Sequence, residues 1–174
     1  MRMKSLVTAA TVGLVAMFTT VSARAEVKTF ARAGVWEAFG GTSNDGQGLC
    51  GVSTRGGGKW IGVKYYKGDE TITIQLSNES WTVTDKDKVS VVMKFDDESP
   101  WRASATAFHM SDGDAALEFS IKEDQMNIFM REFRQSDSLI IRFPDSKVED
   151  WRANLAGTSR VADAMSECLR VLRR

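Results

Sequence analysis

Two cysteines and one histidine are the side chains with the strongest intrinsic chemistry in this chain of 174 residues. Cys50 and Cys168 lie far apart and form no CxxC motif, which does not favour a redox-active dithiol. A zinc site normally needs three or four His, Cys or carboxylate ligands, and His109 stands alone at the end of a predicted strand. The HExxH, GxSxG and SxxK motifs are absent. We therefore predict no catalytic residue, no metal and no cofactor.

Clustered carboxylates are the next candidates for chemistry. Asp96, Asp97 and Glu98 form the densest group, and a pair of carboxylates can support glycoside hydrolysis. They fall in a predicted polar turn, as do Asp112 and Asp114, and acids are common in turns for conformational reasons. Neither group matches the calcium-binding EF-hand pattern. A carboxylate-based hydrolase would require two of these acids to converge in one cleft.

Five tryptophans lie in or next to predicted strands, and most are expected to pack in the core or at its rim. An aromatic face also offers a large contact area at low entropic cost, so one or two of them could line a groove for a sugar or a peptide. The candidates for such an aromatic binding surface are Trp36, Trp60 and Trp81.

Residues 1–25 have the pattern of an export signal. Met1–Lys4 is positively charged, Leu6–Val21 is apolar, and Ala23-Arg24-Ala25 fits the small-x-small cleavage rule. An uncleaved membrane anchor is the alternative, but threonines interrupt the apolar segment, which is shorter than a comfortable span of about 20 residues. We predict cleavage, and a periplasmic or secreted product.

The chain after the leader, residues 26–174, is predicted to be one exported domain, with no linker, repeat or further apolar span and no stable membrane insertion. Without the leader it is slightly acidic and has no dense basic patch, so nucleic acid is not an expected partner. In an oxidising compartment two cysteines most simply form a disulfide, which would join Cys50 to Cys168. A reactive or ligand-binding pair is the alternative.

The spacing of apolar residues predicts a mainly β domain. A first strand is expected at Val35–Phe39 and another at Leu49–Ser53, and period-two alternation continues to Phe119, as half-buried antiparallel strands require. The period then changes to that of a helix over about Ile121–Arg134, where Ser120 and Glu123 form a capping box.

Two strands and a helix complete the prediction. The strands are Leu139–Phe143 and Trp151–Ala156, and the helix begins with Thr158 or Ser159 as N-cap. The apolar face of this helix includes Cys168. The expected fold class is α+β and mainly β, an antiparallel sheet or sandwich with one inserted helix and a C-terminal helix.

The segment from Val89 to Leu172 carries an ordered series of motifs: Phe95-Asp96, Pro100-Trp101, the helix Met126–Phe133, the strand Leu139–Phe143, and Leu155–Ser159 leading to Cys168. This series resembles small exported proteobacterial proteins, namely the VasI-like accessory proteins of type VI secretion clusters and, more loosely, the invasion-associated locus B proteins. The resemblance implies a periplasmic β-rich accessory domain with no catalytic residue to carry over. It favours an envelope-associated role in secretion or host interaction.

The sequence therefore predicts a non-catalytic periplasmic or secreted interaction protein of the bacterial envelope, with another envelope or secreted protein as its partner. The alternative is an inhibitor or immunity-type protein that blocks a cell-wall hydrolase with its loops Gly40–Gly48 and Arg55–Gly58. An enzyme and a small-ligand carrier are further alternatives.

Overall fold

The structure is a computed structural model that describes residues 26–173, so the predicted signal peptide lies outside the described residues and stays a prediction. One sheet and two helices account for most of this part of the chain. In sequence order the elements are β1 (Glu26–Ala33), β2 (Trp36–Thr42), β3 (Gly48–Gly56), β4 (Lys59–Tyr66), β5 (Thr71–Asn78), β6 (Lys88–Phe95), β7 (Trp101–His109), β8 (Ala115–Lys122), α1 (Glu123–Gln135), β9 (Ser138–Arg142), β10 (Trp151–Asn154) and α2 (Thr158–Leu172).

All ten strands belong to one antiparallel sheet, in the order β1-β2-β3-β4-β5-β8-β7-β6-β9-β10. The first five strands form a meander, β8 pairs with β5, and the next strands run back along the chain to β6, which pairs with β9. The two edges are therefore β1 and β10. The predicted fold class, mainly β with one inserted and one C-terminal helix, is confirmed.

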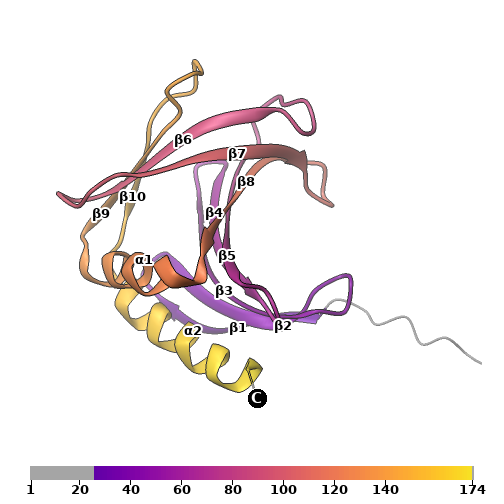
Figure 1. Cartoon of the computed structure of the whole chain (residues 1–174), viewed down its shortest axis with the longest axis vertical. Helices are drawn as coiled ribbons and strands as arrows, with labels where there is room; N and C mark the ends of the chain where they lie inside the picture. Colours follow the sequence, from indigo (N-terminus) through magenta and orange to yellow (C-terminus); the bar gives the residue numbers. More distant parts are fainter. Residues whose placement is uncertain (1–25, 174) are drawn as a thin grey trace, which may run out of the picture.

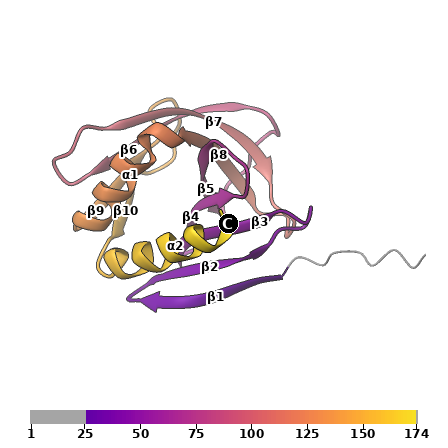
Figure 2. The same ribbon diagram turned by 60° about the horizontal axis from the view of Figure 1, so that its bottom comes forward.

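The sheet is strongly curved, and both helices lie on one of its faces (Figure 1). α2 packs against β1, β2 and β3, whereas α1 packs against β5, β8 and α2. Figure 2 shows the two helices enclosed between β6 and β7 on one side and β1 and β2 on the other. A single continuous core lies between the sheet and the helices.

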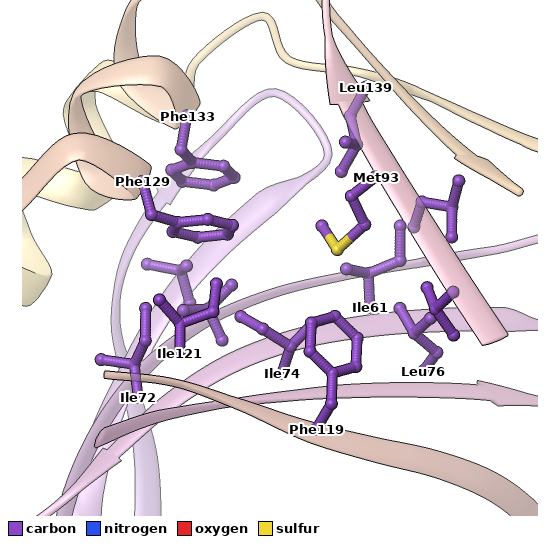
Figure 3. Close-up of a cluster of buried hydrophobic side chains, with 14 of the residues drawn as sticks. Ile61, Ile72, Ile74, Leu76, Met93, Phe119, Ile121, Phe129, Phe133 and Leu139 are labelled. Carbon is purple, nitrogen blue, oxygen red and sulfur yellow. The ribbon is translucent and has the colours of Figure 1, made fainter. Parts of the chain in front are cut away.

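The core is built from the alternating apolar residues that the sequence pattern indicates. Ile72, Ile74 and Leu76 on β5 are fully buried, as are Phe129 and Phe133 on α1. Figure 3 shows these two phenylalanines facing the side chains of β4, β5, β6 and β9 across the core. Period-two alternation places the polar residues of β5 on the opposite face, where Thr73, Gln75 and Ser77 are also buried.

Both predicted helix starts are wrong in detail. β8 continues through Lys122, which is the N-cap of α1 and makes no side-chain cap, and the backbone N–H of Glu123 donates to the Glu70 carbonyl at 2.8 Å. Pairing of β8 with β5 thus replaces the capping box of Ser120 and Glu123. Sheet pairing wins here because it satisfies the same backbone groups while continuing an existing ladder.

The second helix begins after Gly157 rather than after a Thr or Ser cap. Gly157 has φ of 96°, and a Cβ there would lie 2.6 Å from the Ala33 carbonyl oxygen, so both the backbone conformation and the close approach require glycine. The Thr158 hydroxyl donates to the Leu155 carbonyl at 2.8 Å. This contact fastens the start of α2 to the chain leaving β10.

Strand β1 is an element that the sequence analysis does not predict. Its residues are mostly exposed, so the segment has no apolar face that alternation could reveal. β2 and β3 also extend further than predicted, which shortens the two intervening loops to residues 43–47 and 57–58. β10 ends at Asn154 instead of Ala156.

Candidate functional site

The cysteines form the predicted disulfide. The bond joins Cys50 on β3 to Cys168 on α2, with a Cα–Cα distance of 6.0 Å. Cys50 is fully buried, and Cys168 lies at the boundary of the core. The disulfide therefore fixes the last helix to the first half of the sheet.

An apolar groove of about 520 Å³ lies beside this disulfide, between β1 and α2. Its most exposed large apolar side chains are Phe30, at 50% of its surface, and Val171, at 59%. Glu167 supplies a charge at this site. The residues that line the groove are Phe30, Ala31, Gly41, Leu49, Ala164, Glu167, Cys168, Val171 and Leu172.

A β-bulge in β1 places Phe30 at the groove. Thr29 pairs with Phe39 and Ala31 with Ala38, so Phe30 is the extra residue with no partner across the ladder. Its ring approaches Gly40, where a Cβ would lie 3.2 Å from the ring and 2.8 Å from the Cys168 sulfur. Glycine at this position thus makes room for both the phenylalanine and the disulfide.

The edge of the sheet runs along the groove. β1 pairs with β2 on one side only, and within residues 26–173 no strand pairs with its other side. Natural edge strands often carry charges that discourage indiscriminate pairing, and Lys28 and Arg32 lie on this one. The sequence analysis misses Phe30 and Val171 because nothing in the local pattern separates them from ordinary partly buried residues.

The three tryptophans predicted to form an aromatic surface do not lie together. Trp36 is 1% exposed, and its Nε1–H donates to the Asn154 carbonyl at 2.8 Å, so it belongs to the core. Trp60 is on the outer face of β4, with the Lys64 ammonium 5.1 Å from the centre of its ring. Trp81 lines a different hollow, where it is stacked on Trp151. Two of the predicted residues thus remain partly accessible, at separate places.

A polar row crosses the outer face of the sheet, which turns away from the helices. The Lys64 ammonium donates to the Gln75 side-chain carbonyl at 2.5 Å, and the Gln75 amide donates to the Glu118 carboxylate at 2.5 Å. Burial lowers the pKa of Lys64, while attraction to Glu118 acts in the opposite direction. These groups satisfy one another, as partly buried polar groups must, and the row is best explained as structural.

Within the densest group of acids, Asp96 binds the backbone rather than another carboxylate. The carboxylate of Asp96 accepts hydrogen bonds from the backbone N–H groups of Asp137 and Ser138 and from the Ser138 hydroxyl, at 2.8 to 2.9 Å. These bonds lower the pKa of Asp96, and the bond from the Asp137 backbone N–H has the largest effect. Asp97 and Glu98 are exposed in the same turn. Asp96 therefore anchors the start of β9 to the end of β6.

His109 pairs with Asp85 at 2.7 Å, and both side chains are largely exposed. Among the described residues, no group of three or more His, Cys, Asp or Glu side chains is arranged to hold a metal ion. Within the same residues, neither helix has the length and apolar character needed to cross a bilayer.

Comparison with solved structures finds a similarity of fold. No family model matches the chain, and no curated protein matches its sequence. The crystal structure of invasion associated protein B from Bartonella henselae superposes with a TM-score of 0.57 at 10% identity, covering 80% of this chain and 97% of that chain. The looser of the two resemblances is thus supported as a similarity of fold, while no comparison supports the resemblance to VasI-like proteins. The chain shares its fold with that invasion-associated protein.

Proposed function

We propose that this protein is a non-catalytic, exported interaction protein of the bacterial envelope that binds a protein partner at the groove between β1 and α2. The observation that carries the proposal is the combination of an apolar groove with an adjacent unpaired strand edge. Exposed apolar patches on soluble domains commonly mark interaction sites.

Three observations support an extracytoplasmic location, periplasmic or secreted. The first 25 residues have the sequence pattern of a cleaved signal peptide. The Cys50–Cys168 disulfide is typical of oxidising compartments. The third observation is the fold shared with invasion associated protein B.

The partner that fits is an extended segment of another protein. The outer edge of β1 presents backbone N–H and C=O groups to an added strand, and main-chain hydrogen bonds of this kind supply affinity in strand-addition complexes. An apolar side chain on that segment would enter the groove between Phe30 and Val171. Burial of such a side chain contributes about 1.5–3 kcal/mol, which adds selectivity to the backbone pairing.

Site-specific crosslinking in the native envelope tests this proposal. A photoreactive amino acid replaces Phe30 or Val171 in the tagged protein, and Ile128 on α1, which is 43% exposed, is the matched control. We expect both groove positions to crosslink to the same envelope or secreted protein, and the control position not to do so. Equal yields at the control position, or no adduct at either groove position, would contradict the proposal.

The purified pair then provides a quantitative test. Phe30→Asp should weaken binding at least tenfold, because a charge would be buried against the partner, whereas Ile128→Asp should leave the Kd unchanged. A captured cell-wall hydrolase that loses activity on binding would favour the inhibitor alternative over an accessory role.

A further inference from the structure

A second hollow, of about 630 Å³, lies away from β1 and is lined by none of the groove residues. Three segments form its walls: the turn from β3 into β4, the turn that follows β5, and the end of the loop between β9 and β10. Its size falls within the range of roughly 300–1,000 Å³ that is common for small-molecule sites. The lining residues are Gly57, Gly58, Lys59, Asn78, Glu79, Ser80, Trp81, Val148, Glu149 and Trp151.

Two stacked indoles supply the aromatic part of this cleft. The rings of Trp81 and Trp151 are 5.0 Å apart between centroids and inclined by 20°. Phe143 lies 5.4 Å from the first and 5.5 Å from the second, so it contacts the pair from the side. Trp151 is 2% exposed, whereas Trp81 is only partly buried. The face of Trp81 that is turned away from Trp151 is therefore covered by neither of these rings.

Polar groups of both kinds surround the indoles. The Lys59 ammonium lies 5.5 Å from the centre of the Trp151 ring. The side-chain oxygen of Asn78 accepts hydrogen bonds from the backbone N–H and hydroxyl of Ser80, which holds the turn while the Asn78 amide group remains a donor. The Glu79 carboxylate is 3.9 Å from Arg55, beyond hydrogen-bond length, and Glu149 adds a second carboxylate.

This mixture restricts the class of ligand. A wholly apolar molecule would displace water from Lys59, Glu79 and Glu149 and offer these charged groups no hydrogen bond in return. A phosphate would meet Glu79 and Glu149, and a quaternary ammonium would meet Lys59. A sugar ring has an apolar face of C–H groups for an indole and hydroxyl groups that both donate and accept hydrogen bonds at its edge.

We propose that this cleft binds a neutral pyranose unit of a carbohydrate, stacked on the outer face of Trp81, with its hydroxyl groups held by Glu79, Glu149 and Lys59. The inference is independent of the proposed protein partner, because the two sites share no lining residue. It adds a carbohydrate-binding activity to the protein.

The experiment measures binding of a panel of neutral oligosaccharides, including glucans, mannans, galactans and N-acetylglucosamine oligomers, by saturation-transfer NMR and calorimetry. We expect at least one of them to bind saturably. Glu79→Gln and Glu149→Gln keep the side-chain shape, and each should weaken that binding roughly tenfold while the thermal midpoint stays unchanged, because a hydrogen bond to a charged acceptor is lost.

Two controls keep the outcome clear. Trp60→Phe alters an aromatic residue at a different hollow and should leave the sugar affinity unchanged. Phe30→Asp should weaken protein-partner binding at least tenfold and leave sugar binding unchanged. Failure of every oligosaccharide at millimolar concentration, or unchanged binding in the Glu79→Gln and Glu149→Gln double variant, would overturn the proposal.

Discussion

The two edge strands of the sheet, β10 and β1, differ in how deeply their side chains are buried. β10 carries Trp151, which is 2% exposed beneath Trp81, and the carbonyl of Asn154 on the same strand accepts a hydrogen bond from buried Trp36. β1 carries Phe30 at 50% exposure, and its residues are mostly exposed. The aromatic residue on β10 is thus buried in the core, whereas the one on β1 stays accessible.

The end of β1 approaches the chain that leaves β10. A Cβ on Gly34, in the turn after β1, would lie 2.8 Å from the Ala156 carbonyl oxygen, and a Cβ on Gly157 would lie 2.6 Å from the Ala33 carbonyl oxygen. Here the end of β1 is covered by the chain that connects β10 to α2. The groove lies further back along β1, at Phe30 and Ala31, beside α2. The contrast is consistent with the proposed partner site at the β1 edge.

Removal of the buried indole of Trp151 should have the largest effect on stability. Trp151→Ala deletes a buried ring that stacks on Trp81 and contacts Phe143, and we expect a loss of about 3–5 kcal/mol in the free energy of unfolding. Urea denaturation measures this loss. A cost below about 1 kcal/mol would show that the β10 edge is not held by this cluster.

Loss of the disulfide should rank second. The Cys50→Ala, Cys168→Ala double variant should lose about 2–4 kcal/mol, mainly because its unfolded chain is less constrained. Reduction of the native protein should lower its free energy of unfolding by a similar amount, which denaturation with and without reductant measures. Intact mass spectrometry should find the non-reduced protein lighter by two hydrogens, and two alkylatable thiols in exported protein would refute the bond.

A buried hydroxyl at the β10 end provides a smaller test. Thr158→Val keeps the side-chain shape but removes the bond to the Leu155 carbonyl, which still accepts the backbone N–H of Thr158. The expected loss is about 1 kcal/mol, while Thr158→Ser should retain the bond and most of the stability. An unchanged free energy of unfolding in Thr158→Val would indicate that this end is held by packing alone.

The groove should tolerate substitution with little change in stability. Phe30→Ser removes a half-exposed ring from β1, and we expect the free energy of unfolding to change by about 0.5 kcal/mol. The crosslinking and binding of the partner should fall sharply in the same variant. A loss of several kcal/mol would mean that Phe30 is part of the core, and the contrast between the edges would disappear.

The smallest expected effect on stability is confined to low pH. The hydrogen bonds from Asp137 and Ser138 lower the folded-state pKa of Asp96 below its ordinary value of about 3.8. Its contribution to stability is therefore complete above that value and is lost as the pH falls through the lower folded-state pKa. Asp96→Asn should flatten the acid side of the stability profile in thermal melts, whereas Asp97→Asn should not.

Much of the fold follows from local patterns, but the site does not. Alternation at Ile72, Ile74 and Leu76 correctly predicts a strand with one apolar face in the core, because burial of that face imposes a period of two. The prediction that β5 is only half-buried is wrong, because Thr73, Gln75 and Ser77 on the other face are buried as well. The edge strand β1 escapes this reasoning because it buries little, and Phe30 faces the groove only through a bulge that depends on pairing with β2. Trp36 and Trp81 belong to the same residue type, and only their packing separates a core residue from one that lines a cleft.

The sequence by itself determined the mainly β class, the positions of most strands, the two helices and the pairing of two cysteines, because periodicity and residue chemistry are local or compositional. The tertiary structure alone decided the order of the strands and which edge stays open. It also decided that Phe30, Cys168 and Val171 meet beside one groove. Contacts of this kind join residues from opposite ends of the chain, and no local pattern encodes them until the sheet has curved and α2 has packed against it.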